Sequence, residues 1–245
     1  MTIKAWLEGD GFTLHTLAEL FSDGDIRVVR ERDCFYLSSH KIDSPEEGQQ
    51  FYDIARELLL YVNGIGRVSE PRCRPVRLTG EYGDGDRQHV VVEAPTATAH
   101  AWLSASAIVV SVDGVEVPGP PASGPRYAKL ALSHPDVQVV LRMLARPEEL
   151  GWGELYKVYE LIKNKVPQDI RAKDGRFSNT MIRRFKGSAN HPGDAGEFLD
   201  EVRHAVPTGE DGVRRMSLPA GRRFIGDWVG LWLDHLDQSG VRVEE

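Results

Sequence analysis

A segment rich in proline and glycine near the middle of the chain constrains the fold more than any other feature. It runs Pro118-Gly119-Pro120-Pro121-Ala122-Ser123-Gly124-Pro125. Proline lacks an amide donor and glycine loses the most backbone entropy on ordering, so we expect neither a strand nor a helix to continue through it. The hydrophobic period also changes across it, from about two residues to about 3.6. The sequence therefore predicts two domains, 1–120 and 126–245, joined by a linker.

The first half has the pattern of an α+β sheet domain. Runs rich in β-branched and aromatic residues predict strands over 25–31, 34–39, 76–78, 89–93 and 107–117. The last is expected to be a hairpin, because Asp113-Gly114 suits a type I′ turn. One helix is predicted between these strands. Ser44 is its expected N-cap, Glu47 its capping-box partner and Asn63-Gly64 its end.

The second half has apolar residues at helical spacing. Helices are predicted over 137–144, 152–162 and 177–185, followed by a long final helix that begins after an N-cap at Ser217. The fold class is therefore α+β, with a mixed sheet domain followed by an all-α bundle. The final helix also carries more aromatic surface than a small bundle needs, which favours self-association into a homo-oligomer.

Composition limits the class of protein further. At 245 residues and 41% hydrophobic content the chain can bury a substantial core. It contains no apolar run of about 18 residues, so we expect a cytoplasmic protein with no membrane partner. Cys34 and Cys73 lie far apart in the sequence, which indicates neither a disulfide framework nor a thiolate metal site. The first half has no phosphate loop or dinucleotide fingerprint, so no cofactor is expected.

Charge is distributed unevenly between the halves. Residues 1–122 carry 11 basic and 19 acidic side chains, whereas residues 123–245 carry 19 and 18. Within the second half, residues 157–186 hold nine basic groups against three acidic ones. Such a run can attract nucleic acid, although it is more often the pattern of a solvated helix face.

The residues that follow this basic run concentrate the chemistry of the chain. Asn190, His191, Arg203 and His204 occur in one short stretch broken by glycines. Arginine binds phosphate in a bidentate manner, and histidine exchanges protons near neutral pH. The stretch is therefore the candidate catalytic site.

A structural role fits the same side chains. Asn190 would then cap a helix beginning near Pro192, and His204 would cap the end of that helix. Arg203 would pair with Glu197 or Glu160 inside the bundle.

The order of motifs in the second half resembles a known family. A Trp-x-x-Leu-Tyr-Lys helix from Trp152 is followed by a basic helix, by Ser188-Ala189-Asn190, by Gly196 and Arg203-His204, and by a Trp-rich final helix. This order is similar to that of bacterial proteins with an HEPN-like C-terminal helical bundle. The resemblance implies a small bundle that dimerises. Many HEPN domains are metal-independent RNases of toxin–antitoxin and antiphage systems, whereas others are inactive binding modules.

The resemblance also suggests roles for individual residues. Active members use an arginine followed, after four to six residues, by a histidine, usually with a polar residue just after the arginine. Arg184 and His191 match this spacing, although Phe185 occupies the polar place. The adjacent pair Arg203-His204 departs from the spacing.

RNA cleavage without a metal needs a base for the 2′-OH, an acid for the leaving oxygen and a cation for the charge on phosphorus. His204 would be the acid or base, and His191 would be the second proton-transfer group. Arg203 or Arg184 would hold the phosphate, with Asn190 orienting the imidazole or the sugar. Further contacts to the substrate would come from Arg183 and Lys186.

Two functions from different classes follow. The first is an HEPN-type endoribonuclease effector, in which the acidic N-terminal domain senses a trigger or binds a regulatory partner. The second is a non-catalytic binding or scaffold protein that dimerises through the bundle. A zinc hydrolase that uses His191, Asp194 and His204 ranks third, because these residues lack a recognised ligand spacing.

Overall fold

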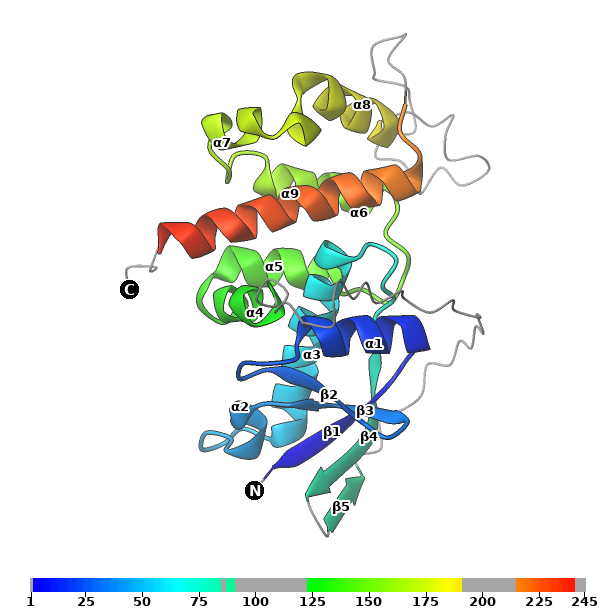
Figure 1. The fold of residues 1–245 in the computed structure, drawn as a ribbon, viewed down its shortest axis with the longest axis vertical. Coiled ribbons are helices and arrows are strands. Elements are labelled where there is room, and N and C mark those ends of the chain that lie inside the picture. The colour runs from blue at the N-terminus through cyan, green and yellow to red at the C-terminus, as the bar shows by residue number, and fades with distance from the viewer. Residues whose placement is uncertain (1, 85–86, 91–122, 191–214, 241–245) are drawn as a thin grey trace, which may run out of the picture. The chain divides into compact units, whose positions relative to one another are not determined.

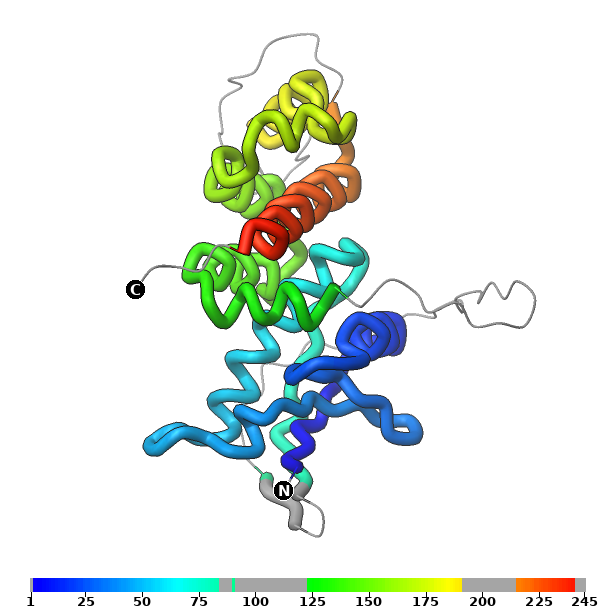
Figure 2. Tube along the Cα trace, turned by 60° about the vertical axis from the view of Figure 1, so that its left-hand side comes forward, coloured from blue at the N-terminus to red at the C-terminus, as the bar shows by residue number. Residues whose placement is uncertain are grey.

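The computed structural model describes residues 2–84, 87–90, 123–190 and 215–240. The chain divides into two compact units. The first comprises Met1–Gly66 with Cys73–Lys129, and the second comprises Arg67–Arg72 with Leu130–Glu245. The described strands all belong to the first unit, and the described part of the second unit is helical (Figure 1 and Figure 2). The predicted α+β class is therefore confirmed.

The first unit is built on a five-stranded antiparallel sheet with the strand order β2-β3-β1-β4-β5. Its strands are β1 (Ile3–Glu8), β2 (Arg27–Glu31), β3 (Cys34–Ser38), β4 (Arg77–Asp84) and β5 (Arg87–Val90). The predicted strands at 25–31 and 34–39 are confirmed as β2 and β3, which pair up to Glu31 and Cys34 on either side of a two-residue turn. The predicted strands at 76–78 and 89–93 overlap β4 and β5. The hairpin predicted at 107–117 lies outside the described residues.

Side chains alternate between the two faces of the central strands. Ala5 and Leu7 of β1, like Leu37 of β3, are buried. Trp6 and Tyr36, which are register partners, lie on the opposite face with their rings 5.4 Å apart in an edge contact. The buried face belongs to the core of this unit, to which two helices contribute, α1 (Gly11–Leu20) and α3 (Phe51–Ser69).

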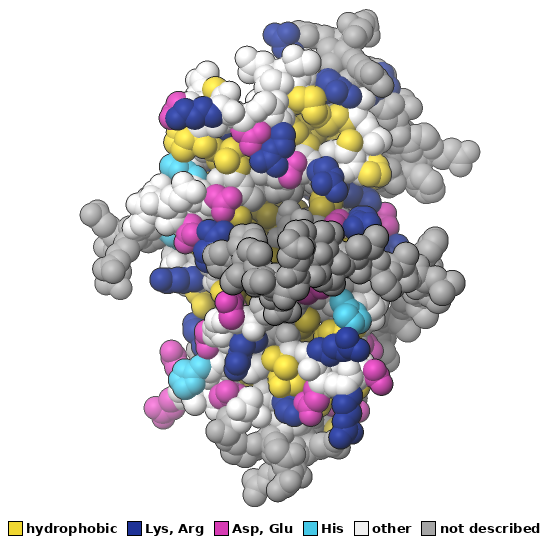
Figure 3. Space-filling model, viewed as in Figure 1, with side chains coloured by type: hydrophobic (Ala, Val, Ile, Leu, Met, Phe, Trp, Pro, Cys, Tyr) yellow, Lys and Arg dark blue, Asp and Glu magenta, His cyan; other side chains and the backbone are white. Residues whose placement is uncertain are grey.

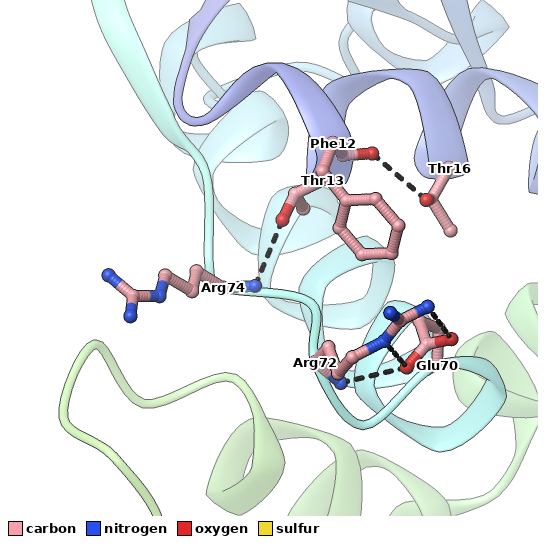
Figure 4. A network of polar contacts seen from close by, with 6 residues as sticks. All are labelled: Phe12, Thr13, Thr16, Glu70, Arg72 and Arg74. Carbon is pink, nitrogen blue, oxygen red and sulfur yellow. Dashed lines mark hydrogen bonds and ion pairs between the residues drawn. The ribbon is translucent and has the colours of Figure 1, made fainter. Parts of the chain in front are cut away.

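Helix α1 begins at an aspartate cap that sequence analysis missed. Asp10 accepts hydrogen bonds from the amide of Thr13 at 2.9 Å and from its hydroxyl at 2.7 Å. The buried hydroxyl of Thr13 in turn accepts a bond from the amide of Arg74 at 3.0 Å (Figure 4). This contact joins the start of α1 to the chain that enters β4.

The helix predicted to start at Ser44 begins later and ends later. Ser44 is instead the C-cap of a short helix, α2 (His40–Asp43), and its amide bonds the carbonyl of His40. Helix α3 passes straight through Asn63-Gly64. Asn63 does not end the helix because its side chain is occupied elsewhere, donating to the carbonyl of Val76 and accepting from its amide, both at 2.9 Å.

The predicted linker also needs a correction at its end. Ser123, Gly124 and Pro125 form the first turn of α4 (Ser123–Ser133), a position in which proline tolerates the loss of its amide donor. Gly124 is required there, because a Cβ would lie 2.3 Å from the carbonyl oxygen of Leu20. Residues 118–122 lie outside the described part of the chain.

The second unit consists of helices with an aromatic core. They are α5 (Pro135–Leu144), α6 (Trp152–Ile162), α7 (Gln168–Lys173), the 3₁₀ helix η1 (Gly175–Phe177), α8 (Asn179–Ala189) and α9 (Leu218–Ser239). The helices predicted at 137–144 and 152–162, and the final helix capped by Ser217, are confirmed. The segment predicted as one helix over 177–185 is divided, because Phe177 ends η1 and Ser178 caps α8.

The aromatic residues of α9 are interior rather than surplus surface. Phe224, Trp228 and Trp232 are exposed by 5%, 0% and 3% respectively. Phe224 and Trp228 meet rings of α6, η1 and α8, so these buried aromatic side chains are used within the unit. The expectation that these side chains leave a surface for self-association is therefore wrong.

Arg67 holds the end of α5 within the second unit. Its guanidinium donates to the carbonyls of Leu144 and Arg146, both at 2.8 Å, and to that of Glu148 at 3.3 Å. The carbonyl of Leu144 is among the last of α5 and has no partner within the helix, and those of Arg146 and Glu148 belong to the chain that follows. The positive charge also complements the helix dipole. In the same short segment Glu70 accepts two bonds at 3.0 Å from the side chain of Arg72 (Figure 4).

Among the described helices none is long and apolar enough to cross a membrane.

Candidate functional site

The structure describes four of the seven predicted site residues, and all four lie on or at the end of α8. Arg183, Arg184 and Lys186 are within the helix, and Asn190 is its C-cap. The predicted catalytic residues His191, Arg203 and His204 lie outside the described residues.

Helix α8 is held by caps at both ends and by one buried ring. Ser178 accepts a bond from the amide of Met181 at 3.4 Å, and the amide of Asn190 bonds the carbonyl of Lys186 at 3.1 Å. Phe185 is fully buried and lies 5.2 Å from the ring of Phe224. Phe185 also meets the rings of Trp152, Tyr156 and Tyr159 of α6. The buried face is therefore fixed mainly against α6, which determines the residues that α8 presents to solvent.

The solvent face of α8 carries two cations one turn apart. Arg183 and Lys186 are both exposed, and neither forms an ion pair with a described residue. Residues three and seven positions apart share a helix face, so Asn190 continues the line from Arg183 through Lys186. His191 is the next residue in the sequence after this line.

Arg184 lies on a different side of the helix. It is half-buried, and its guanidinium contacts the sulfur of Met181 at 3.6 Å and the carbonyl of Arg215 at 3.4 Å. The structure therefore gives this arginine a role in holding the chain just before α9.

Sequence analysis named Ser188 within a motif but assigned it no role of its own. Its buried hydroxyl donates to the carbonyl of Arg184 at 3.0 Å and accepts from the amide of Met216 at 2.7 Å. Met216, the second described residue after position 214, therefore lies at the C-terminal end of α8. A signal was present in the sequence, since Ser188 is a polar residue at helical spacing from Phe185 on the apolar side of the helix.

Asn190 has an unsatisfied buried oxygen. Its Oδ1 atom is inaccessible to solvent and has no hydrogen-bond partner within the described residues. A buried acceptor without a donor costs about 1–3 kcal/mol, so this carboxamide is expected to receive a bond from a group outside that set. The predicted capping of a helix near Pro192 concerns residues outside the described ranges.

The basic run 157–186 contains both paired and unpaired cations. Lys157, Lys165 and Arg176 form ion pairs with Glu154, Asp136 and Asp227, and Arg176 also pairs with Asp174. The hydrogen bond from Arg176 holds the pKa of Asp174 below its usual value.

Other cations of the run have no such partner. Lys163, Lys173, Arg183 and Lys186 form no ion pair with a described residue, which leaves charge available to an anionic ligand. In Figure 3 basic side chains stand among acidic and apolar ones over the helical unit, in the upper part of the view.

No group of three His, Cys, Asp or Glu side chains that could hold a metal ion occurs in the described ranges. His191, Asp194 and His204, the ligands considered for a zinc site, are not among those residues.

Comparison of the chain with protein-family models, with curated proteins and with solved structures finds no match.

Proposed function

We propose that the helical unit is an HEPN-like RNA-binding module, and that the chain cleaves RNA without a metal ion as an effector of a bacterial defence or toxin–antitoxin system. The acidic N-terminal unit would bind the trigger or a regulatory partner. The observation that carries the proposal is the arrangement on α8. Arg183 and Lys186 are exposed there and form no ion pair with a described residue, and Ser188 at the end of the same helix bonds Met216, which follows the residues that include the candidate acid and base in the sequence.

The proposed division of labour follows from the chemistry of phosphodiester cleavage. Exposed cations on one helix face position the backbone of the RNA, because each can neutralise a phosphate and release counterions. His204 and His191 supply the proton transfers, and Arg203 stabilises the charge that develops on phosphorus. Asn190 orients an imidazole or a ribose hydroxyl through the carboxamide oxygen that lacks a partner among the described residues.

A cleavage assay tests the catalytic part. The purified full-length chain is incubated with mixed RNA in the presence and absence of EDTA. Cleavage that persists in EDTA supports the proposal. Binding without cleavage favours the second candidate below, and cleavage that EDTA abolishes indicates a metal-dependent hydrolase.

A pair of variants tests the binding part. The double variant Arg183→Ala, Lys186→Ala should weaken binding to single-stranded RNA and lower the slope of log K against log salt by roughly 0.7 for each phosphate that is no longer neutralised. Lys41→Ala is the matched control, because Lys41 is an exposed lysine of the first unit with no ion pair to a described residue. Equal affinities and equal slopes for the double variant and the wild type would exclude α8 as the RNA-binding surface.

The second candidate is a non-catalytic module that dimerises, and one surface favours it. Val139 of α5 and Leu161 of α6 are exposed by 47% and 43%. Lys165 pairs with Asp136, which joins the turn after α6 to the start of α5. Val139 lies one turn after Asp136 in α5, and Leu161 lies about one turn before Lys165. Because α5 and α6 run antiparallel, these two steps lead in the same direction from the ion pair, so Val139 and Leu161 lie on the same side of it. Such an apolar pair suits contact with a second copy of the chain.

A further inference from the structure

Helix α7 is anchored at both ends but buries none of its own side chains. Val166 before it and Phe177 after it are exposed by only 2% and 3%. Within Gln168–Lys173 itself no residue is buried. A segment that removes so little apolar surface from water gains little stability from its closed position, so local opening costs little.

The main inward contact of α7 is made by Arg171. Its guanidinium carbon lies 5.5 Å from the centre of the Trp228 ring, which is completely buried. Tyr159 borders the same ring at 5.3 Å. Burial raises the pKa of the Tyr159 hydroxyl, and the positive charge of Arg171 acts in the opposite direction, as expected for a guanidinium near the phenol. Arg171 therefore covers one side of an aromatic pair.

The closed position leaves two hydrogen-bond donors unsatisfied. Nε of Arg171 and Nε1 of Trp228 are both inaccessible to solvent and have no acceptor among the described residues. Buried donors without partners are rare and costly, so these two donors offset part of the stabilisation that the cation–π contact of Arg171 gives the closed position. Both groups are donors only, and the ligand that would satisfy them must offer acceptors.

The chain after α7 is fixed by a bridging arginine. Arg176 pairs with Asp174 at 2.7 Å and with Asp227 at 3.2 Å. Asp174 directly follows the helix, and Asp227 is the neighbour of Trp228 in α9. This bridge keeps the C-terminal end of α7 attached to α9, and it gives the helix a fixed point about which to swing.

We propose that α7 is a cover that opens as a unit above Trp228, and that a phosphate group of single-stranded RNA captures the open form by accepting hydrogen bonds from Arg171. The capture step rests on the proposed function, whereas the opening does not. A phosphate oxygen supplies the acceptor that Nε of Arg171 lacks in the closed form. The face of Trp228 that Arg171 vacates becomes a surface on which a base can stack. Lys173, exposed and without an ion pair to a described residue, adds charge beside it.

Hydrogen–deuterium exchange of the free full-length protein tests the opening. Amides of Arg171 and Asp174, which bond the carbonyls of Pro167 and Arg171, should exchange faster than amides in the middle of α6 and α9. Arg171→Ala should accelerate them by about a further tenfold, because it removes a desolvated cation–π contact. Lys173→Ala, the matched control on the same helix, should leave them unchanged. Rates in Arg171→Ala equal to those of the wild type would overturn the proposal.

Adding a short oligouridine tests the capture. Exchange in α7 of the wild type should increase while exchange in α8 decreases, and the α7 response should be absent in Arg171→Ala. Protection of α8 with no change in α7 would refute capture and leave RNA binding in place. Unchanged exchange in both helices would refute the capture and the proposed function together. The opening is tested separately, by the exchange rates of the protein without RNA. The same increase with inorganic phosphate alone would assign the site to free phosphate and overturn RNA as the ligand.

Discussion

The guanidinium of Arg67 donates a hydrogen bond of 2.8 Å to the carbonyl of Leu144, 77 positions later in the chain. The arginine is only 9% exposed, and two further carbonyls share it. Residues 67–72 therefore belong to the helical unit although they precede every other residue of that unit by more than 50 positions.

Replacing this arginine should be costly. Arg67→Met keeps much of the side-chain volume and leaves the three carbonyls without their charged donor, so we expect the free energy of unfolding to fall by about 3 kcal/mol. Urea denaturation followed by circular dichroism measures it. Arg223→Met, at an exposed position of α9, is the control and should change stability by less than about 0.5 kcal/mol. Equal stabilities for the two variants would contradict the assigned role.

Removing the hydroxyl of Ser188 should destabilise the helical unit in a similar way. Ser188→Ala leaves the amide of Met216 without its acceptor, at an expected loss of about 1–3 kcal/mol. Ser239→Ala is the comparison, because that serine is exposed at the end of α9 and its hydroxyl bonds only within its own helix turn. A melting temperature shared by both variants would show that the Ser188 contact adds nothing to stability.

The variant His204→Ala distinguishes a catalytic role of this histidine from a structural one. If it is an acid or base, His204→Ala should abolish RNA cleavage while the melting temperature moves by only a few degrees, since a site residue adds little to packing. A structural cap would instead lose about 1–3 kcal/mol. Arg203→Ala should follow the same pattern as His204→Ala. Strong destabilisation of both, with residual activity in proportion to folded protein, would refute the catalytic assignment.

The stability that the ion pair between Arg176 and Asp174 contributes should depend on pH. The hydrogen bond from Arg176 lowers the pKa of Asp174, so the stabilisation is present above the usual aspartate pKa, about 4, and is lost as pH falls through the lowered value. Asp174→Asn should therefore be less stable than the wild type at neutral pH, by less than about 1 kcal/mol because the pair is partly exposed. The difference should shrink as the pH falls below the usual aspartate value and through the lowered pKa of Asp174. A difference that is constant from neutral to acid would show that the charge of Asp174 is not responsible.

Self-association should depend on the exposed apolar pair rather than on α9. We expect a dimer in sedimentation equilibrium at micromolar concentration, and we expect Val139→Lys with Leu161→Lys to give a monomer of unchanged helix content. Leu132→Lys is the control, since Leu132 is similarly exposed at 37% but lies on α4. A wild-type monomer, or a dimer that survives the double change, would exclude this surface.

Helices α5, α6 and α9 of the second unit could be predicted because each buries one face. Trp228 and Trp232 are four positions apart and both interior, which is the periodicity that the sequence displays. Helix α1 was not predicted, since its buried positions include the polar Thr13, whose role depends on Arg74 61 positions away. Asn63-Gly64 resembled a helix end, and only the contact of Asn63 with Val76 explains why α3 continues.

Only part of the candidate site could likewise be predicted from the sequence. The exposure of Arg183 and Lys186 follows from charge and helical spacing, which a sequence contains. The separate roles of Arg184 and Ser188 could not be predicted in this way, because their partners Arg215 and Met216 are about 30 residues away in the chain before α9, and only the fold brings them to α8.

The contact of Ser188 with Met216 has a consequence for how this chain can vary. Two points of the backbone, at the end of α8 and just before α9, are held together by groups that do not belong to the intervening 191–214. An insertion between these points would add flexible chain, and the entropy of closing a flexible loop grows only with the logarithm of its length, at about 0.6 kcal/mol for each doubling. Insertions or deletions between these two points should therefore be tolerated by the helical core, and new chemistry can be acquired there with little loss of stability.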